Sequence, residues 1–264
     1  MKDFFAVDNG EYRSFTGHII TRNTDGGVEN ANFSIVDGCL IFRSGTWIDG
    51  AVDNCVFCMG TIWKNGYMRH GDFSGCLWEN GTFEDSMWYG ECWRNGVFIN
   101  SSWKDGIWEK GIWKDGVWFC GTWENGIWET GIWYGGTWKD GTWKDGDWWD
   151  GIWVDGTWED GTWRDGTWFQ GVWKDGLWED GIWRGGTWEG GTWKDGTWFR
   201  GVWKDGLWVA GDWRAGTWRD GTWEKGTWVS GIWKSGIWKD GTWWGGTWKD
   251  GTWEHGFDRD GMSR

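Results

Sequence analysis

The chain has no proline, only three histidines and only four tyrosines among its 264 residues. The lack of proline and of a three-residue glycine period excludes a collagen triple helix. No run of 18 apolar residues is present, so a membrane-spanning helix is excluded and no membrane partner is expected. The 38 Trp and 13 Phe residues argue against ordinary disorder, which is poor in aromatic side chains.

The first ten residues contain no basic segment followed by an apolar run, so no signal peptide is predicted. We therefore expect a cytoplasmic protein whose six cysteines are reduced thiols, with a place in a virus particle as the alternative setting. Lys and Arg number 26 against 40 Asp and Glu, which gives a net charge of −14. Because this charge repels phosphates and no basic cluster stands out, direct nucleic-acid binding is not expected.

What the chain does contain is 50 Gly and 38 Trp arranged with a five-residue period. From residue 63 to residue 253 every fifth position is Trp, Phe or Met, and from Trp103 to Trp253 all 31 are Trp. Gly stands two residues before 34 of these 39 positions. Residues 141–145, Gly-Thr-Trp-Lys-Asp, form a typical unit. Such strict periodicity predicts a repeat architecture.

A period of five fits neither a helix nor an unbroken strand. A short strand followed by a corner fits it, because side chains alternate along a strand and Asp-Gly is a strong turn dipeptide. Gly and Trp would then share the inner side of a three-residue strand, with the residues before and after Trp outside. Between positions 107 and 252 the residue that precedes Trp is Thr fifteen times and Ile, Val or Leu thirteen times, which suits a strand.

Corners that recur every five residues predict an all-β, single-domain β-solenoid, a parallel β-helix in which each coil hydrogen-bonds to the next. Residues 1–30 do not follow the period and are expected to form an irregular N-terminal cap. Residues 31–253 carry the repeat, and residues 254–264 are expected to form a C-terminal tail. One extra residue between Phe57 and Trp63 predicts a β-bulge.

Residues 31–35, Ala-Asn-Phe-Ser-Ile, match the unit of the pentapeptide-repeat family: a small residue, Asn or Asp, Leu or Phe, and two variable residues. Residues 71–75 and 76–78 are near matches. Over residues 31–253 the chain resembles a divergent, Trp-rich member of that family. The resemblance implies a right-handed, four-sided coil of four pentads with the central and small residues inside.

Three coil lengths are compatible with the repeat. Residues 166–195 and 196–225 agree at 21 of 30 positions, which suggests one coil of six pentads or two coils of three. Outward charges favour a coil of three pentads, because Lys and Glu alternate at that spacing from Lys114 to Lys204. Three indoles would have the least room in such a coil, and overpacking is destabilising. The same argument favours six pentads over four, because Trp would also overfill a square coil. We nevertheless expect the four-sided coil that the resemblance implies, with three-pentad and six-pentad coils as alternatives.

Metal sites and catalysis are not expected. Cys55, Cys58, His70 and Cys76 have loosely zinc-like spacing, but Cys55 and Cys76 occupy the small slot where Gly otherwise stands. Asp fills fifteen of 30 corner positions from 105 to 250, which turn chemistry explains without calcium. No catalytic motif or phosphate loop is visible, so no catalytic, cofactor-binding or metal-binding residue is assigned and the protein is not expected to be an enzyme.

Aromatic side chains interrupt the charged pattern at six outward positions, and exposed rings are typical of a partner surface. The predicted partner surface consists of Phe119, Tyr134, Trp149, Phe169, Phe199 and Trp244. We expect a non-enzymatic, rigid repeat protein that acts as a structural or protein-interaction module, through a protein partner or self-association, for example in a phage assembly. The alternatives are a DNA mimic that modulates a topoisomerase, which the resemblance implies, and an ice- or glycan-binding solenoid.

Replacing Trp178 by Ala should lower the free energy of unfolding by about 3–5 kcal/mol, because it removes a core indole. Replacing Lys174, an outward residue, should change it by less than about 1 kcal/mol. Denaturant titration of the two variants compares these values, and equal losses would mean that the inside and outside positions are wrongly assigned.

Overall fold

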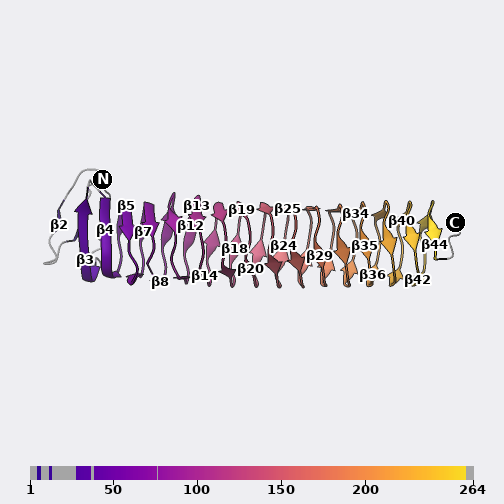
Figure 1. Ribbon diagram of the computed structural model, residues 1–264, viewed down its shortest axis with the longest axis horizontal. Helices are drawn as coiled ribbons and strands as arrows, with labels where there is room; N and C mark the ends of the chain where they lie inside the picture. The colour runs from indigo at the N-terminus through magenta and orange to yellow at the C-terminus, as the bar shows by residue number, and fades with distance from the viewer. Residues whose placement is uncertain (1–4, 7–11, 14–27, 37–38, 76, 260–264) are drawn as a thin grey trace. The chain divides into compact units, whose positions relative to one another are not determined.

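A computed structural model of the protein describes residues 5–6, 12–13, 28–36, 39–75 and 77–259. The chain divides into two compact units, Met1–Gly131 and Ile132–Arg264. Short parallel strands make up most of each unit (Figure 1), and the part of the chain that is described has no helix able to cross a membrane. The predicted fold class, an all-β β-solenoid of parallel strands, is therefore confirmed in each unit.

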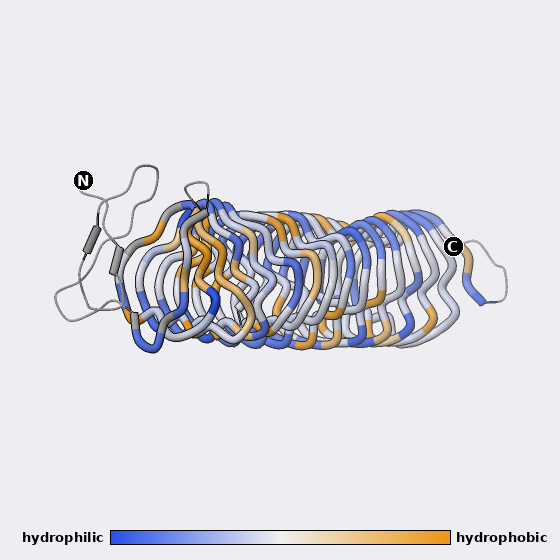
Figure 2. Tube along the Cα trace, turned by 60° about the vertical axis from the view of Figure 1, so that its left-hand side comes forward, coloured by the Kyte–Doolittle hydropathy of each residue, from blue (hydrophilic) through white to orange (hydrophobic). Residues whose placement is uncertain are grey.

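Each coil of the second unit contains three pentads. Trp168 pairs with Trp183, and Trp183 pairs with Trp198, so a strand lies beside the strand three pentads further on. The coils lie on one another along each unit in the tube of Figure 2, where Trp takes an intermediate colour. Three strands per coil give three faces, and the four-sided coil that we expected is wrong.

We name the three faces of the second unit after one outward residue on each. The Trp149 face contains β19 (Ile132–Trp133), β22 (Asp147–Trp148), β25 (Thr162–Trp163), β28 (Leu177–Trp178), β31 (Thr192–Trp193), β34 (Leu207–Trp208), β37 (Thr222–Trp223), β40 (Ile237–Trp238) and β43 (Thr252–Trp253). The Phe169 face contains β20 (Thr137–Trp138), β23 (Ile152–Trp153), β26 (Thr167–Trp168), β29 (Ile182–Trp183), β32 (Thr197–Trp198), β35 (Asp212–Trp213), β38 (Thr227–Trp228), β41 (Thr242–Trp243) and β44 (Phe257–Asp258). The Lys174 face contains β21 (Thr142–Trp143), β24 (Thr157–Trp158), β27 (Val172–Trp173), β30 (Thr187–Trp188), β33 (Val202–Trp203), β36 (Thr217–Trp218), β39 (Ile232–Trp233) and β42 (Thr247–Trp248).

The first unit contains longer strands near its beginning. A small antiparallel pair, β1 (Phe5–Ala6) and β2 (Tyr12–Arg13), precedes β3 (Val28–Val36), which pairs antiparallel with β4 (Cys39–Trp47). The strands that follow are parallel. The long strands β5 (Ala51–Phe57) and β7 (Tyr67–Phe73) each run through two pentads, and with β6 (Thr61–Trp63) and β8 (Leu77–Trp78) they give two strands per coil. The strands after them are three per coil: β9 (Thr82–Glu84), β10 (Met87–Trp88), β11 (Cys92–Trp93), β12 (Val97–Ile99), β13 (Ser101–Trp103), β14 (Ile107–Trp108), β15 (Ile112–Trp113), β16 (Gly116–Trp118), β17 (Thr122–Trp123) and β18 (Ile127–Trp128).

The packing of the indoles explains how three fit in one coil. Trp168 stacks on Trp183 of the next coil with ring centroids 4.8 Å apart and planes 6° apart. Within the coil it meets Trp173 edge to face, at 6.1 Å and 73°. Each ring thus presents its edge to the next ring of the coil and its faces to the neighbouring coils, an arrangement that aromatic quadrupoles favour. Our volume argument failed because it treated the indole as a bulky group without orientation.

The core is closed along the second unit. Every core indole from Trp133 to Trp238 has an exposed fraction of 0%, and the three that follow are half-buried. The residues before and after each Trp lie on the outside of the coil, as predicted. In the first unit, Phe42, Val52 and Phe57 are also buried. They follow the same five-residue period, one residue out of step with the series that begins at Trp63.

Most of the repeat glycines belong to the corners and not to the strands. Most strands contain two residues, the Trp and the residue before it, so the expected three-residue strand is wrong. Gly181 has φ of +122°, and a Cβ on it would lie 2.6 Å from the carbonyl oxygen of Gly166 in the coil before. Its N–H donates to Asp180 Oδ1 over 2.6 Å, which confirms the predicted Asp-Gly corner.

The residue inserted before Trp63 is accommodated in a corner. Trp47 pairs with Trp63 and Phe57 with Phe73, both one residue longer than the usual spacing. The turn at Met59 and Gly60 takes up the extra residue between β5 and β6, so the expected bulge within a strand is wrong. Most of the predicted cap, residues 1–30, lies outside the described residues, and the boundaries at residues 30 and 254 stay predictions.

Gly181→Ala should lower the free energy of unfolding by about 1–3 kcal/mol from the left-handed backbone alone. The close carbonyl of Gly166 should add to that loss. Gly190→Ala is the matched control, because Gly190 has no positive φ and its Cβ would lie 3.4 Å from the nearest atom, Lys174 O. Denaturant titration should find the control within about 1 kcal/mol of the parent. Equal losses in both variants would contradict the corner geometry.

Candidate functional site

The interior of the solenoid has no room for a substrate, because stacked indoles fill it. Among the residues that the structure describes, no three or more His, Cys, Asp and Glu side chains are placed to hold a metal ion. Of the zinc-like set, Cys55 is buried in the core, Cys58 is half-buried, and Cys76 lies outside the described residues. His70 is exposed and faces Asp85 at 3.8 Å.

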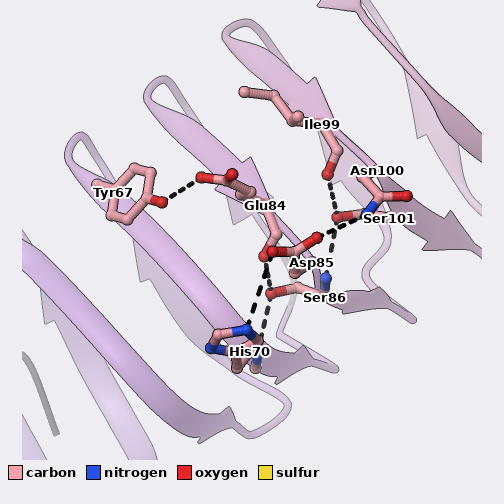
Figure 3. Close-up of polar contacts among 9 residues, drawn as sticks. Tyr67, His70, Glu84, Asp85, Ser86, Ile99, Asn100 and Ser101 are labelled. Carbon is pink, nitrogen blue, oxygen red and sulfur yellow. Dashed lines mark hydrogen bonds and ion pairs between the residues drawn. The ribbon is translucent and has the colours of Figure 1, made fainter.

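His70 belongs to a row of corner residues in the first unit (Figure 3). His70, Asp85 and Asn100 follow one another at intervals of three pentads and all have positive φ, between 43° and 49°. Asn100 Nδ2 donates to Asp85 Oδ1 over 2.7 Å. In these corners the residue before the small inner slot adopts the left-handed conformation, whereas later corners place a glycine with positive φ in the slot itself.

Two serines fill the inner slots beside this row. Ser86 Oγ donates to Glu84 O over 2.5 Å and accepts the N–H of Gly71 over 2.9 Å. Ser101 Oγ donates to Ile99 O over 2.7 Å and accepts the N–H of Ser86 over 3.0 Å. These bonds pair buried backbone groups, so both hydroxyls have a structural role and neither is poised as a nucleophile.

Cys92 is a second group with unusual chemistry. Its thiol donates to Glu109 Oε1 over 3.3 Å. Burial, followed by this hydrogen bond and the negative charge of Glu109, raises the pKa of the Cys92 thiol from 9.0 to about 11. A thiol that stays protonated is a poor nucleophile and a poor metal ligand.

The six predicted partner residues are all exposed, but they do not form one surface. Phe119 follows β16 in the first unit, where Lys104 Nζ lies 3.6 Å from the centre of its ring. Tyr134 and Trp149 lie on the Trp149 face of the second unit. The Phe169 face carries Phe169, Phe199 and Trp244.

The arginine beside the rings of the Trp149 face is paired with carboxylates. Tyr134 and Trp149 lie 5.8 Å apart, and the Arg164 guanidinium lies 4.5 Å from the Trp149 ring. Arg164 also contacts Asp147 at 3.5 Å and Glu179 at 3.3 Å. A partner would therefore have to displace two carboxylates to reach this arginine.

The Phe169 face offers a different arrangement. The Arg184 guanidinium lies between two exposed rings, 5.4 Å from Phe169 and 5.6 Å from Phe199. Arg200, the corner residue that follows Phe199, donates its Nε–H to Arg184 O over 3.2 Å. Neither arginine meets an acidic side chain among the described residues. Two positive charges beside two aromatic rings are thus left for a partner.

An open groove of about 790 Å³ runs along this part of the face. Its lining consists of Ile152, Val154, Asp155, Phe169, Gln170, Arg184, Phe199 and Arg200. Gly185, at the corner after Arg184, contributes no side chain, and a Cβ there would lie 3.3 Å from Phe169 O and 3.7 Å from Arg200 Nε. We refer to this surface as the Phe169 groove.

The other outward cations contrast with the groove. On the Lys174 face, Lys174 pairs with Glu159 at 3.1 Å and Lys204 with Glu189 at 2.6 Å, which bears out the alternation of charge at a spacing of three pentads. Arg214, one coil beyond Phe199 on the Phe169 face, pairs with Asp212 at 2.8 Å. Ile182 stands where Asp212 would be in the coil of Arg184, so Arg184 lacks that partner.

A hollow of about 270 Å³ is lined by Trp243, Trp248, Trp253 and Asp258 at the last described coil of the second unit. Residues 260–264 follow directly and lie outside the described residues. Self-association at this end of the repeat therefore stays a prediction.

Comparison with protein-family models, curated proteins and solved structures finds no match to this chain. The site therefore rests on its own geometry. The sequence identified the rings of the Phe169 groove but missed Arg184 and Arg200. The signal was present, because Phe169, Arg184 and Phe199 follow one another at intervals of three pentads, but it is visible only when the coil length is known.

Alkylation of Cys92 should be slow at pH 9, where about 1% of a thiol with a pKa of about 11 is ionised. The exposed Cys120 serves as the internal reference and should react first. Raising the pH toward 11 should accelerate the reaction of Cys92. Peptide mass spectrometry after timed iodoacetamide treatment measures both rates, and equal rates at pH 9 would contradict the environment described for Cys92.

Proposed function

We propose that the protein is a non-enzymatic repeat protein that acts as a structural and protein-interaction module, and that the Phe169 groove is its docking surface. The observation that carries this proposal is the unneutralised Arg184 between two exposed Phe rings. Aromatic residues and Arg dominate the binding energy of protein interfaces. Buried indoles and a backbone paired on both sides hold the groove, so binding would order few groups.

We also propose that the chain is a divergent relative of the pentapeptide-repeat family. The small residue that recurs two positions before most core aromatics supports this assignment. Residues 31–35 match the family's unit in sequence but lie in the antiparallel strand β3. The three-pentad coil departs from the four-sided coil that the resemblance implies, so we carry over none of the family's partners.

Panning a random peptide-display library tests the interaction function without assuming a partner. The wild-type protein should enrich peptides that bind the groove. The double variant Phe169→Ser/Phe199→Ser should retain less than one tenth of their binding, because it removes both rings.

The matched control is Lys174→Ser/Lys204→Ser, which changes two outward residues two coils apart on another face. Its binding should equal that of the wild type, and denaturant titration should show that both variants remain folded. A library without enriched peptides, or enriched peptides that bind the Phe169/Phe199 variant equally well, would overturn the proposed docking surface.

A further inference from the structure

We propose that the Phe169 groove binds an acidic Pro-x-x-Pro segment in the polyproline II conformation, with a carboxylate between the two prolines. This inference rests on the proposed interaction function and names the partner chemistry of the same site. Its basis is the spacing of the rings and the charge between them.

The two rings stand two coils apart. Core indoles of successive coils here are 4.8 and 4.7 Å apart, so two coils span about 9.5 Å, as the usual strand spacing requires. Three residues of polyproline II rise about 9.3 Å, which places every third side chain at the same distance on the same side. Same-side residues of an extended strand are about 6.6–6.8 Å apart and do not match. Prolines at positions i and i+3 can therefore lie on Phe169 and Phe199 together.

The charge between the rings selects an acidic residue. Arg184 lies midway between Phe169 and Phe199, and Arg200 stands at the adjoining corner. A carboxylate on either residue between the two prolines would meet a guanidinium, which binds carboxylates through two parallel hydrogen bonds. One acidic residue, Asp155, lines the groove, and it lies one coil before Gln170.

The row of corner residues beside the groove is acidic at Asp140 and Asp155 and contains no acidic residue from Gln170 to Gly245. In this row Asp140 lies before the groove and Asp155 lines its beginning, and each accepts the N–H of the following glycine. From there onward the row carries no acid through six coils: Gln170, Gly185, Arg200, Ala215, Ser230 and Gly245. An acidic segment that lies along this row therefore meets no carboxylate beyond Asp155.

The lining of the groove suits a single extended chain. The groove is lined by outward residues and by the corner residues that follow them in sequence, as Gln170 follows Phe169 and Arg200 follows Phe199. Polyproline II segments are narrow, have little conformational entropy to lose and dock in aromatic-lined grooves of other proteins.

Isothermal titration calorimetry of the full chain with synthetic peptides tests the proposal. The probe is an acetylated and amidated peptide with two Pro-Glu-Glu-Pro units. The comparison peptides replace Glu by Lys, change the proline spacing to Pro-Glu-Pro or Pro-Glu-Glu-Glu-Pro, or form an acidic Ala-rich helix. The acidic Pro-x-x-Pro peptide should bind at least tenfold more tightly than every comparison peptide, and added salt should weaken its binding.

Arg184→Gln and Phe199→Ala should each weaken that binding at least tenfold, whereas Lys174→Gln should leave it unchanged. Equal binding of the Lys peptide, the respaced peptides or the helix would overturn the inference, as would equal binding by Arg184→Gln. An oligogalacturonate that binds where the peptide does not would also overturn it in favour of an acidic glycan.

The display experiment separates the two failures. Enriched peptides that need Phe169 and Phe199 but lack an acidic Pro-x-x-Pro motif would leave the docking surface in place and reject its proposed ligand. Failure of every peptide would reject both.

Discussion

The packing of indoles in two perpendicular directions is the constraint on which the rest of this structure depends. Along the repeat each ring stacks on its counterpart three pentads further on, and around the coil it meets the next ring edge to face. Only an orientation shared by all three rings of a coil satisfies both contacts. The spacing of the stacked rings is that of hydrogen-bonded strands, so the two contacts agree with the backbone pairing between coils. At that spacing a side chain at the Gly181 corner would strike the Gly166 carbonyl, and the positive φ there also favours glycine, which is why glycine accompanies the core Trp residues so regularly.

In the second unit the buried core consists of Trp alone, so the chemical variety lies on the outside. Each pentad has three variable positions: before the Trp, after it and at the corner. Their neighbours along a face are the equivalent residues three pentads away, so the surface consists of rows such as Glu159 with Lys174, or Phe169 with Arg184. In the row of Glu159, the cations Lys174 and Lys204 each have a carboxylate of the same row as a partner. The Phe169 groove differs because its cations lack that complement.

The sequence supported the strand-plus-corner unit, the buried Trp positions and the Asp-Gly corners, because these depend on contacts within a few residues. Coil length depends on how rings orient against one another across coils, which residue volume does not describe. The alternation of Lys114, Glu129 and Lys144 did carry the answer, since only a coil of three pentads puts opposite charges side by side. Arg184 and Arg200 escaped notice for the same reason, because their ring neighbours are distant in sequence.

The internal similarity of residues 166–195 and 196–225 gains a meaning from the three-pentad coil, since each of these segments is two complete coils. Phe169 and Phe199 occupy equivalent positions of these two segments. Copying a two-coil segment in tandem would therefore create a pair of rings at a defined separation in one genetic event, with an arginine already between them. In such a chain, recombination between repeats is a route to new recognition sites that leaves the core unchanged.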